Sequence, residues 1–172
     1  MSENSKTVDG FLFLPPALRA WIGKDIPDQP FSGRIPWVPF DKSISEAIFT
    51  LMTSAGISMK SGPPFDMEGE KAEPTWGDPS YREIPKTATE NDIEVNHLHI
   101  NTAFIKQDIN VMLPLARFQE FEQEGLIGKL APTCYSYYGY QTDPTALLNE
   151  TMPQVAERMR QENVEAVLLT PA

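Results

Sequence analysis

The chain has 172 residues, 41% of them hydrophobic, and its 14 basic and 24 acidic residues give a formal net charge of −10. This length suits one domain with an extension, and the acidic charge disfavours nucleic acid and anionic membranes as partners. No apolar run is long enough to cross a bilayer, and the chain does not begin like a secretory signal. The single cysteine, Cys134, excludes an internal disulfide and favours a cytoplasmic location.

Residues 1–45 are predicted to form an irregular N-terminal extension. Eleven of the 16 prolines lie in the first half of the chain, and proline fixes φ and removes a backbone donor. We expect disorder in residues 1–10. Residues 11–22 are apolar and predict a short helix after Pro15, which docks on the domain or contacts a partner chain.

Residues 46–172 are predicted to form an α/β domain. Segment 61–91 is rich in glycine and proline and is expected to be a long loop without regular structure. Apolar segments otherwise alternate with helical ones, which predicts an open, mostly parallel sheet with helices on both faces, in three layers of the Rossmann or flavodoxin type. Strands are expected at 47–53, 92–99, 130–138 and 164–170, and helices at 114–124 and from about Thr151. Because no helix follows the last strand, we expect the domain to be truncated at its C-terminus.

In such sheets, ligands gather at the carboxyl ends of the strands. Ser54 and Gly56 follow the first strand, where hydroxyl and backbone N–H groups suit an anion, although an ordinary strand-to-loop turn is the favoured interpretation. His97 and His99 lie two residues apart on a predicted strand and therefore on one face, which suits acid–base catalysis, substrate contact or a structural role. A metal site would need a third ligand such as Asp108, and we do not predict one.

The segment 76–85 is dense in polar and turn-forming residues. Arg82 offers a planar fork that suits a substrate carboxylate, or it pairs with a neighbouring acid in a rigid loop. The predicted catalytic residues are His97 and His99, and the predicted substrate-binding residues are Ser54, Gly56, Asp78, Ser80, Arg82, Asp108, Asn110 and Thr170.

Several short motifs follow one another in an order that resembles a known enzyme family. Over residues 34–172 the chain resembles the selenoprotein B family of glycine, sarcosine, betaine and D-proline reductases. The motifs are Trp37-Val-Pro-Phe, Ala47–Gly56, Gly77–Pro85, His97-Leu-His99, Gln107–Pro114, Glu124–Gly128, Ala131-Pro and Ala166–Pro171.

The resemblance implies a subunit of an amino-acid reductase, an oxidoreductase that acts on a small amino-acid-like substrate and draws electrons from a dithiol. It implies reductive cleavage at the carbon bearing the amino group by a selenol or thiol nucleophile just after Ala172, at an unread UGA codon. It also implies a pyruvoyl group on a partner subunit and no cofactor in this chain, which alone is then inactive.

The alternative is a non-catalytic α/β binding or complex-assembly subunit that is complete at 172 residues. The codon after Ala172 separates the two hypotheses, because an in-frame UGA followed by coding sequence favours the reductase. Association with reductase subunits or with a second copy of the chain is compatible with both.

Overall fold

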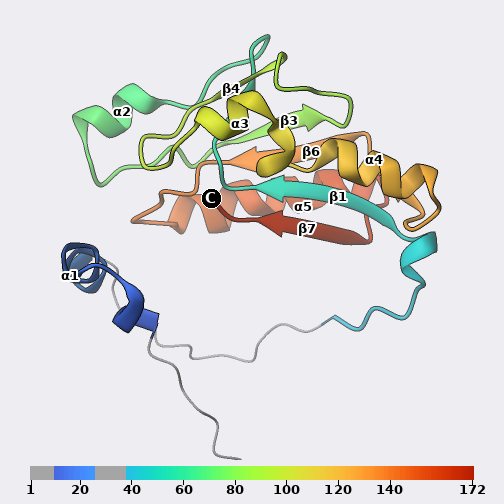
Figure 1. The fold of residues 1–172 in the computed structure, drawn as a ribbon, viewed down its shortest axis with the longest axis horizontal. Helices are drawn as coiled ribbons and strands as arrows, with labels where there is room; N and C mark the ends of the chain where they lie inside the picture. The colour runs from blue at the N-terminus through green and yellow to red at the C-terminus, as the bar shows by residue number, and fades with distance from the viewer. Residues whose placement is uncertain (1–9, 26–37) are drawn as a thin grey trace, which may run out of the picture. The chain divides into compact units, whose positions relative to one another are not determined.

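The computed structural model describes residues 10–25 and 38–172 (Figure 1). The contacts within the chain divide it into one unit that ends at Val38 and another that begins at Pro39. Among the described residues, no helix has both the length and the apolar character needed to cross a membrane.

The first unit contains a 3-10 helix, Gly10–Phe13, followed by α1, Pro16–Asp25. This confirms the short helix predicted after Pro15, where the fixed φ of proline suits the first helical turn. The disorder predicted for residues 1–10 lies outside the described residues except at Gly10, so it stays a prediction.

The second unit is built around β1, Ile48–Thr53, which confirms the first predicted strand. One edge of β1 pairs in parallel with β7, Ala166–Thr170, and the other pairs in parallel with β5, Lys129–Leu130, and then with β6, Thr133–Tyr137. An antiparallel strand, β3, Tyr81–Pro85, lies on the far side of β6. The predicted α/β fold with a mostly parallel sheet is therefore confirmed (Figure 1).

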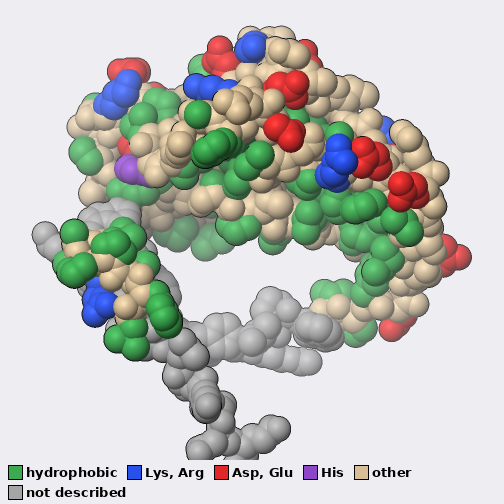
Figure 2. All heavy atoms as spheres, in the orientation of Figure 1, with side chains coloured by type: hydrophobic (Ala, Val, Ile, Leu, Met, Phe, Trp, Pro, Cys, Tyr) green, Lys and Arg blue, Asp and Glu red, His purple; other side chains and the backbone are tan. Residues whose placement is uncertain are grey.

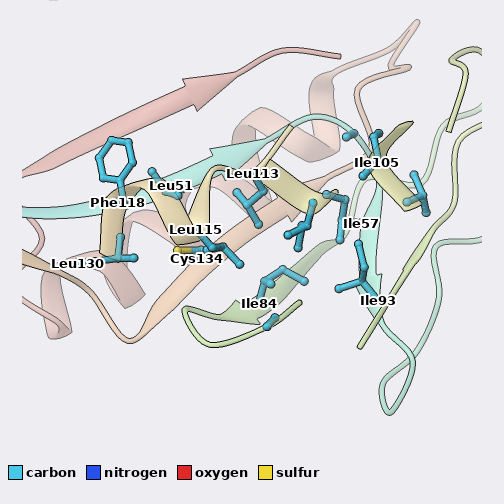
Figure 3. Packing of buried hydrophobic residues seen from close by; sticks show 14 of the residues in the cluster. Leu51, Ile57, Ile84, Ile93, Ile105, Leu113, Leu115, Phe118, Leu130 and Cys134 are labelled. Atoms are coloured by element: carbon cyan, nitrogen blue, oxygen red, sulfur yellow. The ribbon is translucent and has the colours of Figure 1, made fainter. Parts of the chain in front are cut away.

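The helices α3, Ala103–Gln107, α4, Leu115–Gln123, and α5, Met152–Gln161, cover the two faces of this sheet. Successive residues of a strand point to opposite faces, so each strand contributes to both cores. On one face Leu51 and Cys134 belong to the larger core cluster, which Figure 3 shows with residues of α3 and α4 around it. On the other face Met52 and Tyr135 pack against Val155 of α5.

The segment 61–91 is not a loop without regular structure, so that prediction is wrong. It contains α2, Met67–Ala72, and the edge strand β3. The helix is too short for an apolar period to be visible in its sequence. Pro85 is compatible with β3, because an edge strand has one side that makes no sheet hydrogen bonds and therefore tolerates a proline.

The predicted strand 92–99 is shorter and lies in another sheet. It forms β4, Ile93–Val95, which pairs antiparallel with β2, Ile57–Met59, in a separate two-stranded sheet. His97 and His99 lie beyond the end of β4, so the alternation that placed them on one face of a strand does not apply.

Two other boundaries differ from the prediction. The strand expected at 130–138 is divided into β5 and β6 around Pro132, which has no N–H to give to a ladder. The last helix begins before Thr151, because a π-helical turn, Leu147–Thr151, runs directly into α5.

Strand β7 leaves apolar side chains uncovered. Val167, Leu168 and Leu169 are all exposed, Leu169 to 64%. Hydrophobic side chains gather in Figure 2 along the margin of the second unit where Figure 1 shows β7. Among the described strands, β7 pairs with β1 alone, so its outer edge also carries unpaired backbone groups. An apolar strand with an open edge promotes association between chains.

We therefore expect the 172-residue chain to self-associate through β7. Analytical ultracentrifugation should show an average mass that rises with concentration, and Leu169→Lys should shift the population toward monomer. Leu126→Lys, at another exposed apolar position (53%), should leave the association unchanged and serves as the matched control. A parent chain that stays monomeric at every concentration contradicts this expectation.

Candidate functional site

The carboxyl ends of β1 and β7 meet at one rim of the sheet. The Ser54 N–H donates to the carbonyl oxygen of Thr170 at 3.3 Å, and the Ala172 N–H donates to Ser54 Oγ at 2.8 Å. Gly139, which follows β6, donates its N–H to the carbonyl oxygen of Ser54 at 2.9 Å. The structure thus brings Ser54, Thr170 and the last residue of the chain together.

The turn after β1 uses its backbone donors inside the chain. The Ala55 N–H donates to Thr53 Oγ1 at 3.2 Å, and the Gly56 N–H donates to the carbonyl oxygen of Tyr137 at 3.0 Å. Gly56 has a φ of 65°, and a Cβ there would collide with the carbonyl oxygen of Asn96. These contacts favour an ordinary, glycine-dependent turn over an anion-binding one.

Both histidines lie near this rim, in the loop after β4. The His97 ring packs on Tyr138 with ring centroids 4.6 Å apart, and the His99 ring packs on Tyr140 at 4.1 Å. The two imidazole centroids are 6.0 Å apart, and the backbone N–H of His99 donates to His97 Nδ1 at 3.2 Å. Tyr138 also forms a β-bridge with Ala55, which ties the histidines to the turn after β1.

A buried carboxylate that the sequence analysis missed lies among these rings. Glu70 of α2 is 3% exposed, and its two oxygens have different partners. The Tyr138 hydroxyl donates to Glu70 Oε2, and His99 Nε2 makes a hydrogen bond with Glu70 Oε1. The surrounding sequence, Met67-Glu-Gly-Glu-Lys, has the pattern of a solvated helix, so it gave no signal that this acid is buried.

Burial shifts the pKa values of His97 and Tyr138 in opposite directions. Desolvation, followed by the neighbouring His99, lowers the pKa of His97 from 6.5 to about 4, although Glu70 opposes the shift. Desolvation and then the hydrogen bond to Glu70 raise the pKa of Tyr138 well above its usual range. At neutral pH His97 is therefore uncharged, and Tyr138 keeps the proton that it donates to Glu70.

Arg82 uses its donors within the chain. Its Nε and Nη2 donate to the carbonyl oxygens of Pro63 and Pro64 at 2.8 and 2.7 Å, and Nη1 donates to Ser80 Oγ at 2.8 Å. Nη2 also lies 3.6 Å from a carboxylate oxygen of Asp78. Of the two interpretations of Arg82, these contacts favour a rigid loop braced by an ion pair.

The contacts between Arg82 and Asp78 also stabilise the position of α2, the helix that carries Glu70. Asp78 accepts the N–H of Asp66 at 2.9 Å, and Asp66 accepts the N–H of Gly69 at 2.8 Å as the N-cap of α2. The Arg82 guanidinium lies 4.2 Å from the centroid of the Phe65 ring, just before this cap. Asp78, Ser80 and Arg82, predicted to bind substrate, are thus close to α2 and stabilise its position.

Asp108 and Asn110 make contacts of a structural kind. Asp108 Oδ1 accepts the N–H of Asn110 at 2.9 Å, and Asn110 Oδ1 accepts the N–H of Ala116 in α4 at 2.8 Å. Within the described residues, no hydrogen bond or ion pair joins either of them to His97 or His99. No group of three or more His, Cys, Asp or Glu side chains in the described part of the chain is arranged to hold a metal ion.

A hollow of about 270 Å³ opens beside the end of the chain. It is mostly apolar, and it begins at Ile100, one residue after His99, and reaches Ala172. Thr170 Oγ1 donates to the carbonyl oxygen of Met112, which is also part of the lining. The hollow is thus lined by the residues after β7 and by the segment that follows His99, whereas His99 and Glu70 themselves are not part of its described lining.

The depressed pKa of His97 predicts a dependence of stability on pH. The unfolded chain takes up a proton near pH 6.5, whereas the folded chain resists it down to about pH 4. His97 should stabilise the fold above pH 6.5, and this contribution should be lost as the pH falls toward 4. Urea denaturation of the parent chain and of His97→Gln should show a difference that shrinks over this range. An NMR titration of the His97 ring with a midpoint near 6.5 contradicts the prediction.

The contacts of Arg82 predict a stability defect for Arg82→Ala. The substitution removes several charge-assisted hydrogen bonds and leaves Asp78, 7% exposed, without its ion-pair partner. We expect a loss of about 3 kcal/mol in the free energy of unfolding, measured by urea denaturation. Arg117→Ala, which removes an exposed i, i+3 pair with Glu120, should cost well under about 1 kcal/mol. Equal effects of the two substitutions contradict the structural role of Arg82.

Comparison with known proteins identifies relatives of this chain. Residues 28–172 match the family described as glycine/sarcosine/betaine reductase selenoprotein B. The chain is 34% identical over 134 residues to the D-proline reductase subunit gamma of Acetoanaerobium sticklandii, a match that covers 78% of this chain and 52% of that protein. It is 32% identical over 142 residues to the glycine reductase complex component B subunit gamma of Carboxydothermus hydrogenoformans, which covers 83% of this chain and 32% of that protein.

A third relative is the glycine reductase complex component B subunit gamma of Symbiobacterium thermophilum, 30% identical over 142 residues. The chain spans about half of the length of the first of these relatives and about a third of the length of the other two. No solved structure matches the chain.

Proposed function

Because the chain belongs to the glycine/sarcosine/betaine reductase selenoprotein B family, we propose that it forms part of the subunit that carries out reductive cleavage in an amino-acid reductase complex. The observation that supports this most is the rim at the carboxyl ends of β1 and β7, where an open hollow is lined by Pro171, Ala172 and the segment that begins directly after His99. Substrates of the size of glycine, sarcosine, betaine or D-proline suit a hollow of about 270 Å³.

We propose that the nucleophile is a selenol or thiol outside these 172 residues. Cys134 is fully buried, and desolvation raises its pKa to about 11, so it forms no thiolate near neutral pH. The nucleophile attacks the carbon that bears the amino group, the new Se–C or S–C bond forms as the C–N bond breaks, and the leaving amine takes up a proton. A dithiol then supplies two electrons to cleave the adduct and becomes a disulfide.

The proposed partners follow from the relatives, which are subunits of multi-subunit reductases by name. We propose that the chain assembles with other reductase subunits and meets its dithiol donor in the cytoplasm. The group that activates the substrate amine, a pyruvoyl by family resemblance, belongs in this proposal to a partner subunit.

The reductase proposal is tested by thiol-dependent turnover. The full-length subunit, assembled with its partner subunits, should consume one of glycine, sarcosine, betaine or D-proline, and the 172-residue chain alone should consume none. Substrate loss and disulfide formation are measured together, because they should be equal. Turnover by the 172-residue chain alone overturns the placement of the nucleophile, and inactivity of the assembled complex on all four substrates overturns the reductase function.

A second candidate is a non-catalytic assembly subunit. This candidate is favoured by two observations. The turn at Ser54–Gly56 and the Arg82 side chain both donate their hydrogen bonds to groups inside the chain. If this candidate is right, His99→Gln leaves the turnover of the assembled complex unchanged while the subunits still co-purify.

A further inference from the structure

The two histidines at the rim have different surroundings, although they are two residues apart. His97 packs on Tyr138, and its Nδ1 accepts a backbone N–H, so one of its nitrogens is used inside the loop. The His99 side chain is 43% exposed, and its Nε2 contacts the buried Glu70 carboxylate. This difference suggests that the loop presents one imidazole to a substrate and holds the other for structure.

We propose that Glu70 is a positioning residue that keeps the His99 imidazole protonated at Nε2 and directs its Nδ1 to the rim, so that His99 alone is the proton-transfer group there. Its role in turnover rests on the proposed reductase function. The arrangement of the two side chains does not, and it can be measured without turnover.

Glu70 is held from two sides. Its second oxygen accepts the hydroxyl of Tyr138, a side chain with no exposed surface. Its helix is fixed by the Asp66 cap and by the link from Asp66 to Asp78. A buried carboxylate is costly without donors, and it has no proton of its own to give when ionised. With Glu70 ionised, as the proposal takes it to be, the His99 nitrogen that faces it supplies the proton of their hydrogen bond.

This requirement fixes the tautomer of His99. With the proton on Nε2, the neutral imidazole has a free lone pair on Nδ1, and the charged form has a transferable proton there. Within the described residues, Nδ1 of His99 has no hydrogen-bond partner. The ring stacks on Tyr140, which limits its rotation.

Among the described residues, four ionisable side chains surround His99 and its partner. Those that titrate and contact it or its partner are Glu70 from α2, His97 from the same loop, and Tyr138 and Tyr140 after β6. His97 is uncharged near neutral pH, because burial lowers its pKa to about 4, so the loop carries no second imidazolium beside His99. In the charged form, Nδ1 gives its proton to the leaving amine and the neutral imidazole remains with Nε2 still bonded to Glu70.

The arrangement is tested first by NMR of the imidazole nitrogens in the 172-residue chain. Nitrogen-15 shifts should show His99 with Nε2 protonated and Nδ1 bare in the neutral form. Glu70→Gln should reduce this preference, and Glu68→Gln, an exposed acid on the same helix, should not. A dominant Nδ1–H tautomer in the parent chain, or a preference that Glu70→Gln leaves unchanged, overturns the proposal. If Glu70→Gln fails to fold, a dominant Nδ1–H tautomer in the parent chain still overturns the proposal.

Turnover of the assembled complex tests the consequence. Glu70→Gln should lower kcat by roughly tenfold to a hundredfold with little change in KM, less than the roughly 10²–10⁴-fold expected for His99→Gln. Glu68→Gln should match the parent. An unchanged kcat in Glu70→Gln overturns the positioning role. If the parent complex is inactive but the NMR result holds, the reductase function fails and the Glu70–His99 arrangement stands.

Discussion

Parallel pairing along both edges of β1 determines where the other parts of the second unit lie. Because β6 and β7 both run parallel to β1, their carboxyl ends reach the same rim, with Thr53 opposite Ser136 on one side and Thr170 on the other. Every turn that leaves this rim starts from a position fixed by ladder hydrogen bonds. The helices cover the two faces and leave the rim open, which is the place where open α/β sheets bind ligands.

An ionised carboxylate costs several kcal/mol to bury without hydrogen-bond partners. A segment that buries one must therefore hold it against its donors, and a loop fixed only at its two ends would not do so. The segment between β2 and β3 meets this constraint with internal contacts. The ion pair of Asp78 with Arg82 fixes the cap of α2, and α2 delivers Glu70 to donors on Tyr138 and His99. The residues near position 80 thus affect the site through the position of α2 and need no contact with a substrate.

The sequence predicted the parts of the fold that depend on continuous apolar runs. The strands β1 and β7 and the helix α4 are long or regular enough to show their period, and all three were placed correctly. Short elements with mixed composition were missed, since α2 has a single buried residue, Glu70, and β3 ends in a proline at the edge of the sheet.

Both histidines could be selected from the sequence, because imidazole is rare here and chemically versatile. Their partners could not, because Glu70 and Tyr138 are 68 positions apart and meet only through the packing of α2.

The loop after β4 also explains how two like residues in one motif acquire different chemistry. On a strand, His97 and His99 would share one face and one environment. In the loop, the Asn96 N–H bonds to the carbonyl oxygen of Gly56 at 2.8 Å, which holds the chain at the rim while the two rings turn to different neighbours. One ring is desolvated against Tyr138 and stays neutral, and the other remains partly in solvent beside a carboxylate. Placing two like groups in different environments is a common way to give them distinct roles in acid–base chemistry. Here the close approach of the loop depends on Gly56, because its φ is positive and a Cβ there would collide with the carbonyl oxygen of Asn96.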